Sequence, residues 1–179
     1  MELKEIKQLE GYGVCFKRLT EDKIELVRRW RNDPKISRYM EYREEISPEA
    51  QLKWFHRIDN ESNYYFLIVM EGKEIGLINI RDVDFARKTG EPGIFIWDDD
   101  YLNSDISFRS NLLLTDFAFD TLHLEELVIH VLSDNKRAIQ YNKCFGYKLS
   151  EGQQDVYNQE YTLDLERYLR SKERILKYL

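Results

Sequence analysis

The sequence predicts an α/β fold in which helices flank one mixed β-sheet. The first reason is a hairpin pattern, because the apolar runs 64–70 and 75–83 are separated only by the turn Glu71-Gly72-Lys73. The second is a strand–helix–strand order, with apolar segments 93–97 and 127–132 on either side of a helical pattern over 108–122. The third is size, because 179 residues that are 42% hydrophobic suffice for one compact core.

The segment before the hairpin predicts one strand and two helices. Residues 14–19 alternate weakly, as in a strand. Apolar residues at helical spacing follow, with Thr20 as the expected N-cap and Pro34 as the expected end. A second helix is expected to begin at Pro48, because proline suits the first position of a helix.

The segment after residue 132 predicts a helix, two strands and a last helix. Residues 135–145 have helical spacing and Gly146 can cap their end, while 147–150 and 161–165 predict strands. Residues 166–179 predict an amphipathic helix with a basic face. We expect this helix to pack on the domain or, in a homodimer, on a second subunit. Without a flexible linker, 1–179 is expected to form a single domain with its core at about 14–165.

Composition excludes several classes of protein. A net charge of −6 argues against nonspecific binding to nucleic acid and against attachment to an anionic membrane. Cys15 and Cys144 have neither metal spacing nor a disulfide framework, and no run could span a bilayer, so a cytoplasmic protein is expected. No metal is expected, because the carboxylates at 98–100 are typical of a solvated face; a metal or cationic-amine site is the alternative.

The most informative stretch joins the strand 93–97 to the helix 108–122 through a short polar loop. A strand, a tight turn and a helix N-terminus together can hold phosphate, because free backbone amides and the helix dipole face the turn. Glycines, which usually let such a turn close around phosphate, are absent between Asp98 and Leu122. The order of strand, turn and helix that can hold phosphate is therefore present, but the turn lacks the glycines that usually bind it.

Two segments carry a resemblance to a known family. The segment LTEDKIELVRRWRNDPKISRYM (19–40) resembles the first helix and loop of one bacterial branch of the GNAT superfamily of acyl-CoA-dependent N-acyltransferases. That branch includes ribosomal-protein, polyamine and amino-sugar acetyltransferases. The segment FAFDTLHLEELVIHVLSDNKRAIQYNKCFGYK (117–148) resembles the same branch's helix, fifth strand and fourth helix. The resemblance extends from about residue 14 to 165 and implies the GNAT fold.

The resemblance implies that the turn holds the pyrophosphate of acetyl-CoA and that the splayed strands 93–97 and 127–132 hold its pantetheine arm. The family's leading arginine or glutamine falls at Leu102, and its glycines fall at Asn103, Asp105 and Ser107. The departure therefore covers the whole motif. Asparagine and aspartate enter left-handed backbone conformations more readily than most residues, so the turn could still close.

Two alternatives follow for acetyl-CoA. In the first it binds, helped by Arg109, Lys136 or Arg137. In the second, Asp105 or Ser107 caps the helix and occupies the amides that a pyrophosphate needs. The expected cofactor-binding residues are Ile96, Trp97, Leu102, Asn103, Asp105, Ile106, Ser107, Phe108, Asn135 and Arg137.

The resemblance also implies catalytic groups. The tyrosine with which many relatives protonate the leaving sulfur falls at Asn142, and Tyr141 points about 100° away around the helix. Asn142 could instead hydrogen-bond the sulfur or a water. Glu91 is the best-placed carboxylate for a general base, with a solvated role as the alternative. Asn135 either contacts the cofactor or caps the helix that follows it.

The loop 30–45 covers the acceptor site in the family that the chain resembles. Trp30, Tyr39 and Met40 could stack on a sugar or base, and Arg31 could meet a phosphate. For Trp30 and Met40 a place in the core is the favoured alternative.

Together these observations predict an N-acyltransferase that moves an acetyl group from acetyl-CoA to the primary amine of a small molecule, with a nucleotide-linked amino sugar as the first choice of acceptor. The competing hypothesis is a catalytically degenerate GNAT fold that binds a ligand or a protein partner.

Overall fold

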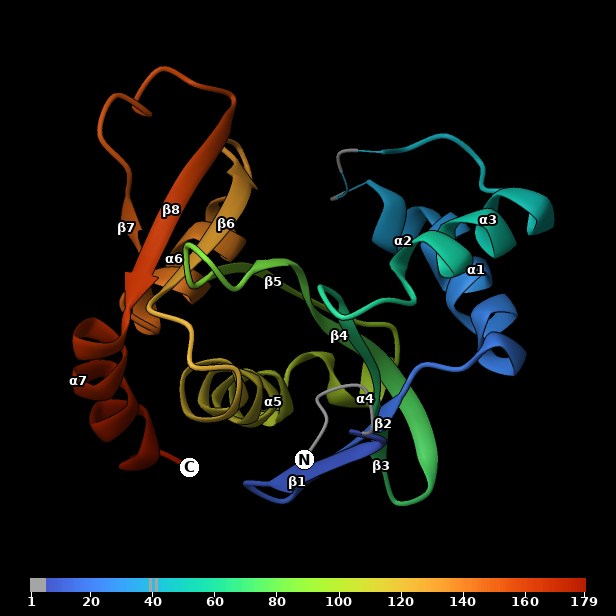
Figure 1. Cartoon of the computed structure of the whole chain (residues 1–179), viewed down its shortest axis with the longest axis horizontal. Helices are drawn as coiled ribbons and strands as arrows, with labels where there is room; N and C mark the ends of the chain where they lie inside the picture. Colours follow the sequence, from blue (N-terminus) through green and yellow to red (C-terminus); the bar gives the residue numbers. More distant parts are fainter. Residues whose placement is uncertain (1–5, 39, 41) are drawn as a thin grey trace.

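The computed structural model describes residues 6–38, 40 and 42–179, and one mixed sheet runs through it (Figure 1). The sheet order is β1-β2-β3-β4-β5-β6-β8-β7. The strands are β1 (Gln8–Gly11), β2 (Val14–Arg18), β3 (Tyr64–Met70), β4 (Lys73–Asp84), β5 (Thr89–Ile96), β6 (Glu126–Leu132), β7 (Lys148–Leu149) and β8 (Asn158–Asp164).

Neighbouring strands pair antiparallel except β5 and β6, which pair in parallel. The predicted hairpin is confirmed as β3–β4, with Tyr64 opposite Ile80 and Met70 opposite Lys73. The predicted strand–helix–strand unit is confirmed as β5, a helix and β6. The mixed α/β fold class is therefore confirmed.

Helices cover both faces of the sheet. They are α1 (Ile24–Asn32), α2 (Pro34–Ser37), α3 (Pro48–Ile58), α4 (Asp99–Leu102), α5 (Ile106–Asp116), α6 (Lys136–Cys144) and α7 (Leu165–Leu176), with one 3₁₀ turn at Glu21–Lys23 and one π-helical turn at Phe117–Thr121. Figure 1 shows α1, α2 and α3 grouped at one end of the molecule, apart from α5 and α7. Because side chains alternate along a strand, Phe66 packs in the core on the α5 side, while Tyr65 and Leu67 pack under α1 and α3.

Several elements differ from the predictions at their ends; β5 begins at Thr89 and not at 93, and β8 begins at Asn158 and not at 161. Thr20 makes no side-chain cap bond, because the 3₁₀ turn Glu21–Lys23 separates it from α1. The helix predicted over 108–122 begins at Ile106 and passes into the π-helical turn after Asp116. The predicted polar loop holds the short helix α4, because Asp98 accepts a hydrogen bond from the Asp100 amide and so caps it.

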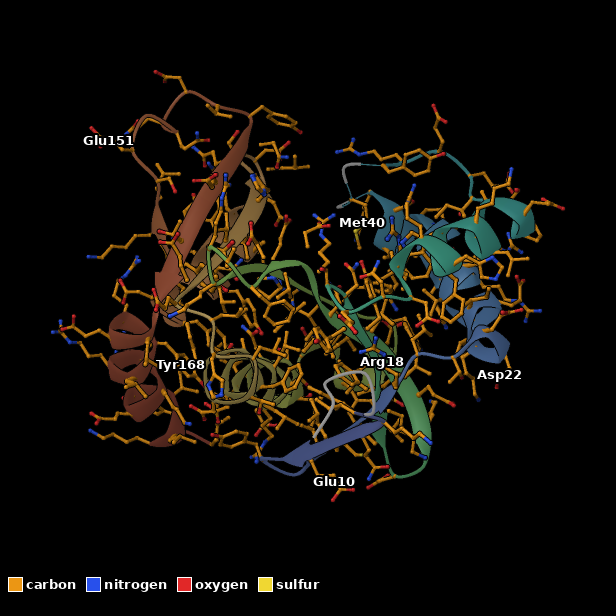
Figure 2. The ribbon with its side chains drawn as sticks, viewed as in Figure 1. Glu10, Arg18, Asp22, Met40, Glu151 and Tyr168 are labelled. Carbon is orange, nitrogen blue, oxygen red and sulfur yellow. The ribbon has the colours of Figure 1, made fainter. Side chains whose placement is uncertain are left out.

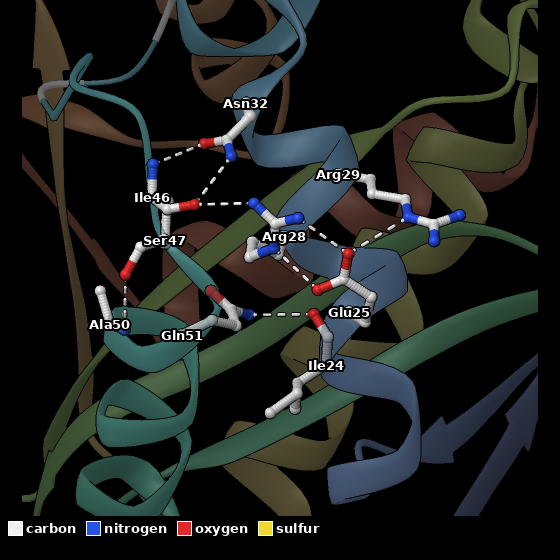
Figure 3. A network of polar contacts seen from close by, with 9 residues as sticks. All are labelled: Ile24, Glu25, Arg28, Arg29, Asn32, Ile46, Ser47, Ala50 and Gln51. Atoms are coloured by element: carbon white, nitrogen blue, oxygen red, sulfur yellow. Dashed lines mark hydrogen bonds and ion pairs between the residues drawn. The ribbon is translucent and has the colours of Figure 1, made fainter.

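A polar network ties α1 to the chain that enters α3 (Figure 3). The Asn32 amide accepts a hydrogen bond from the Ile46 N–H at 2.8 Å and donates one to the Ile46 carbonyl at 2.9 Å. Arg28 also donates to that carbonyl, and Glu25 holds Arg28 in place. The loop between α2 and α3 is therefore fixed at its far end against α1.

The last helix, α7, is anchored to α5 by buried polar contacts. Tyr168, labelled in Figure 2, donates hydrogen bonds to the Leu112 carbonyl at 3.1 Å and to Asp116 at 2.6 Å, and Lys172 pairs with the same carboxylate. A Cβ on Gly146, whose φ is +97°, would lie 2.9 Å from the Arg167 carbonyl oxygen and 2.8 Å from the Ser171 hydroxyl. Glycine is therefore required where α6 ends against α7. In the described part of the chain, no helix is long and apolar enough to cross a bilayer.

Candidate active site

The sheet opens between β5 and β6. Within these two strands only two residue pairs form, Thr89 with Glu126 and Gly90 with Leu127. The Trp97 amide donates a hydrogen bond to the carbonyl of Ile75 in β4 at 2.9 Å. Because backbone groups alternate in direction along a strand, the N–H and C=O groups of the odd-numbered residues in this part of β5 point toward β4. By alternation, the N–H and C=O groups of Ile94 and Ile96 face the opening without a strand partner. An extended chain that carries amide groups can pair with this free edge.

The N-terminus of α5 lies just beyond the end of β5. Among the described residues, the Ser107 and Phe108 amides have no hydrogen-bond partner, and the Ile106 amide donates only a long bond of 3.3 Å to Ser104 Oγ. Asp105 does not cap the helix. Its carboxylate pairs with Arg109 at 2.7 Å, and Arg109 lowers the pKa of that carboxyl. The amides and the positive end of the helix dipole are therefore open to an anion.

The missing glycines cost this turn no backbone strain. Asn103 has φ −110° and Asp105 has φ −78°, which are ordinary values for any residue. The described non-glycine residues with positive φ lie elsewhere in the chain, and Ser107 is not among them. The turn reaches α5 through α4 without a positive φ, so the left-handed conformations expected for Asn103 and Asp105 are not used.

Two arginines expected to help the cofactor are engaged in contacts within the protein. Arg109, besides Asp105, donates to the carbonyls of Tyr12 at 3.2 Å and Leu179 at 3.0 Å. Arg137 donates to the Leu102 carbonyl at 3.3 Å and so ties α6 to α4. Both arginines hold the turn in place around the α5 amides.

The predicted catalytic residues on α6 donate hydrogen bonds to backbone carbonyls of the protein. The Tyr141 hydroxyl donates to the Ser107 carbonyl at 2.8 Å, and burial raises the pKa of this phenol. The Asn142 amide donates to the Ala138 carbonyl of its own helix at 2.9 Å. Asn135 caps α6, because its side chain accepts a hydrogen bond from the Ala138 amide at 3.1 Å. Tyr141 and Asn135 therefore support the frame of the site.

Tyr147, which the sequence indicated only as a strand residue, has a free hydroxyl group. The residue is 4% exposed, and burial raises its pKa, with smaller contributions from Tyr141 and Glu91. Among the described residues its hydroxyl has no hydrogen-bond partner, yet its oxygen is not fully enclosed like that of Tyr64. A phenol that keeps its proton and has no partner can donate to a ligand. Its position directly after the C-cap Gly146 was the signal available in the sequence.

Glu91 belongs to a chain of charged groups on the α1 side of the opening. Its carboxylate pairs with Arg81 on β4 at 2.5 Å and lies 3.5 Å from His130 Nδ1 on β6. The other imidazole nitrogen lies 3.9 Å from Glu160 on β8. With its side chain 20% exposed, Glu91 is held in place and is not simply solvated. This row of charged groups, Arg81, Glu91, His130 and Glu160, passes from β5 to β6 where the two strands separate.

Arg31 on α1 is half-buried, and its charge has no counter-ion in the described part of the chain. Its Nε is enclosed and has no hydrogen-bond partner in the part of the chain that the structure describes, and no carboxylate there forms an ion pair with it. Burial lowers its pKa, and the neighbouring Arg81 lowers it further. Leaving such a group unpaired is costly, so an anionic ligand is the natural partner.

The aromatic residues of the expected acceptor loop take structural places. Trp30 stacks on Trp97 with ring centroids 5.9 Å apart and an interplanar angle of 5°. Trp97 is 3% exposed and packs, with Trp30 and Met40, in the core under α1 and α3. The side chain of Trp97 therefore points away from the phosphate turn. Tyr39 lies outside the described residues.

Two surface hollows lie away from this site. One lies at the α3–β3 turn beside Asn60 and Asn63, and one lies beside Gly13 and Cys15. Neither hollow is lined by a residue of β5 or β6, so neither belongs to the opening. In the described residues no cluster of histidine, cysteine and carboxylate side chains could hold a metal ion.

A free strand edge, an open helix N-terminus and a charged row beside them together define a site for an extended, phosphate-bearing acyl carrier. The model of the GNAT acetyltransferase domain matches residues 14–148, so this chain belongs to the GNAT acetyltransferase family. It is accordingly an acyl-CoA-dependent N-acetyltransferase.

Individual relatives agree with this assignment. The chain is 27% identical over 146 residues to acetyltransferase PseH of Campylobacter jejuni, covering 79% of this chain and 87% of that protein. It is 23% identical over 140 residues to spermidine N(1)-acetyltransferase of Escherichia coli, covering 78% and 75%. A solved structure described as apo FdhC, a nucleotide-linked sugar GNAT, superposes with a TM-score of 0.79 at 21% identity over 96% of this chain and 98% of that chain. These comparisons give no support to the degenerate alternative.

Proposed function

We propose that this enzyme transfers the acetyl group of acetyl-CoA to the primary amine of a nucleotide-linked amino sugar. The observation that carries the choice of acceptor is Arg31, which is half-buried with an enclosed Nε and lacks a counter-ion in the described residues. The phosphates of a nucleotide would supply that charge and accept paired hydrogen bonds from the guanidinium group. The fold shared with a nucleotide-linked sugar GNAT is consistent with this acceptor.

Arg31 also weighs against the second candidate, a polyamine. The chain has relatives named spermidine N-acetyltransferases, so this acceptor class needs a test. A polyamine carries several positive charges. Arg81 lies close enough to lower the pKa of Arg31, and of these two arginines Arg81 alone forms ion pairs within the described residues, with Glu91 and Asp82. A further cation beside Arg31 would be repelled, whereas an anion would be attracted.

For acetyl-CoA, we propose that the pyrophosphate binds the Ser107 and Phe108 amides. Both are open in the described structure, and Arg109 offsets the charge of Asp105 beside them. The pantetheine arm, which contains two amides, then pairs with the free edge at Ile94 and Ile96. This pairing directs the thioester into the opening between β5 and β6.

In the proposed reaction, the acceptor ammonium first gives one proton to the Glu91–His130 pair, and the imidazole passes it toward Glu160 and solvent. The amine nitrogen then attacks the thioester carbonyl and forms the C–N bond of the amide, and it loses its second proton by the same route through Glu91 and His130 to solvent. The C–S bond breaks, and the electron pair leaves on sulfur. Tyr147 donates a hydrogen bond to this thiolate. Because burial raises the phenol's pKa, Tyr147 keeps its proton, and the thiolate takes its final proton from solvent.

The test measures the release of free CoA thiol with each acceptor of a panel. It compares a nucleotide-linked amino sugar, the same amino sugar without the nucleotide, and spermidine. We expect kcat/KM for the nucleotide-linked sugar to exceed that for the free sugar by about 100-fold, the worth of two charge-assisted contacts. Equal values for the two sugars would contradict a nucleotide-linked acceptor, and a preference for spermidine would favour the polyamine candidate.

A further inference from the structure

The outer side of α7 carries an apolar stripe without a partner in the described structure. Leu165, Leu169 and Leu176 are exposed by 42%, 49% and 44% of their surface. At 3.6 residues per turn these three side chains fall within about 40° of one another around the helix. Figure 1 shows α7 at the edge of the molecule, away from the opening between β5 and β6. Aligned exposed leucines on one helix are typical of a surface that packs against another helix.

The inner side of α7 already accounts for the packing of the helix on its own domain. Tyr168, Ser171 and Ile175 are its buried residues, and Tyr168 and Lys172 are fixed by Asp116 of α5. Ser171 lies so close to Gly146 that a Cβ there would come within 2.8 Å of the Ser171 hydroxyl. The stripe is therefore held rigidly in a helical arrangement, which lowers the entropy cost of any association through it.

The charges beside the stripe complement themselves. Glu166 and Glu173 flank it, and Arg170 and Lys177 lie on the same flank. Within the helix Arg170 pairs with Glu166, and both side chains are exposed and can also contact a second copy. In an antiparallel pair of α7 helices related by a two-fold axis, each contact between the copies occurs twice. Glu166 then lies opposite Lys177 of the second copy, and Arg170 lies opposite Glu173 of the second copy. The midpoint of each pair falls between residues 171 and 172. A two-fold axis placed there therefore brings both pairs together in one alignment of the two helices.

The same register also brings the apolar residues together. Leu176 of the second copy lies at the level of residue 167, between Leu165 and Leu169 and within one helical turn of each. We propose that α7 joins two copies of this chain in an antiparallel helix pair about a two-fold axis. The two copies pair along a single helix of twelve residues, so the dimer is concentration-dependent and weaker than a standard-sized interface. Both active sites remain separate in this dimer, and the proposal does not depend on the acceptor.

The experiment is sedimentation equilibrium of the full chain from about 5 to about 200 μM, a range that brackets a micromolar dissociation constant. We expect the wild type to approach the mass of two chains. Glu166→Lys and Lys177→Glu should each weaken the dimer by about tenfold or more, because two attractive contacts become repulsive. Glu151→Lys, an exposed change in the β7–β8 connection, is the matched control and should leave the dimer unchanged (Figure 2).

Mixing the Glu166→Lys and Lys177→Glu variants gives the decisive result. In their heterodimer, each of the two contacts between position 166 of one copy and position 177 of the other again joins a lysine to a glutamate. The mixture should therefore recover the wild-type dissociation constant. Leu169→Glu should abolish the dimer in either background. A wild type that remains a monomer across the range would overturn the proposal. A dimer unaffected by Leu169→Glu, or a mixture no tighter than its components, would do the same.

Discussion

Replacing Arg31 by methionine separates the role of its charge from a role in packing. Methionine has a similar length and no charge, so it can follow the arginine stem through the same surroundings. In the described structure Arg31 Nε is buried without a partner, and Arg81 lowers its pKa further. An unsatisfied buried polar group of this kind costs about 1–3 kcal/mol. The ligand-free variant should therefore be more stable than the wild type.

The expected gain is about 1–2 kcal/mol in the free energy of unfolding, or roughly 2–8 °C in Tm for a chain of this length. Catalysis should move in the opposite direction. A nucleotide phosphate loses a charge-assisted partner worth about 1.5–3 kcal/mol, so kcat/KM for the nucleotide-linked acceptor should fall roughly 10- to 150-fold. The value for a free amino sugar should not change. Thermal denaturation and steady-state kinetics on the same samples measure both effects.

Arg29→Met is the matched control for this experiment. Arg29 lies on the same helix, but its side chain is 73% exposed and pairs with Glu25 at 3.2 Å. Removing an exposed i,i+4 pair should change stability by at most about 0.5 kcal/mol and leave the kinetics unaltered. The reasoning is refuted if Arg31→Met lowers stability and leaves both acceptors with wild-type kinetics, because Arg31 would then be a packing residue.

Three further predictions concern the turn, the Tyr147 hydroxyl and the α1 network. Asp105→Asn should tighten acetyl-CoA about two- to fivefold by calorimetric titration, because removing one exposed charge near the pyrophosphate is worth roughly 0.5–1 kcal/mol; unchanged affinity would place Asp105 away from the phosphates. Tyr147→Phe should lower kcat about 10- to 100-fold with little change in KM, whereas Tyr141→Phe should cost about 1 kcal/mol of stability and spare kcat; the reverse result would exchange their roles. Arg28 lowers the pKa of Glu25 from 4.5 to about 2. The ionised Glu25 therefore contributes fully to the free energy of unfolding above pH 4.5, and this contribution is lost as the pH falls through 2. The stability difference between wild type and Glu25→Gln should therefore shrink over that interval in acid denaturation, and a constant difference would contradict the pairing.

Long apolar elements were predictable because one local pattern decides them. The bounds predicted for β3 match the structure, since an uninterrupted apolar run ends at the turn Glu71-Gly72-Lys73. Strand β1 was missed because its four residues alternate between exposed and half-buried positions and form only one edge pairing. Such an edge strand depends on its neighbour and has no apolar signal of its own.

The candidate site was predictable in position but not in detail. The order of strand, turn and helix indicated the anion site, and the open amides of Ser107 and Phe108 agree with it. The partner of Asp105 could have been found from sequence, because Arg109 lies four residues later on the same helix. Contacts between distant elements were not accessible in this way. The contact of Glu91 with His130 joins β5 to β6, and the free hydroxyl of Tyr147 depends on the side chains that the fold packs around it.

The gap between β5 and β6 also makes stability depend on the supply of acetyl-CoA. Only two residue pairs join the two halves of the sheet across this gap, so the empty enzyme lacks part of a strand's worth of hydrogen bonds. A bound carrier would complete the sheet, adding RT ln(1 + [L]/Kd) to the free energy of unfolding, or about 2.7 kcal/mol at 100 times Kd. Amide hydrogen exchange at Ile94 and Ile96 should slow on binding, as it does when a strand is added to a sheet. When the carrier is scarce, the enzyme would then open more often and be degraded sooner, so its abundance would follow the acyl-CoA level.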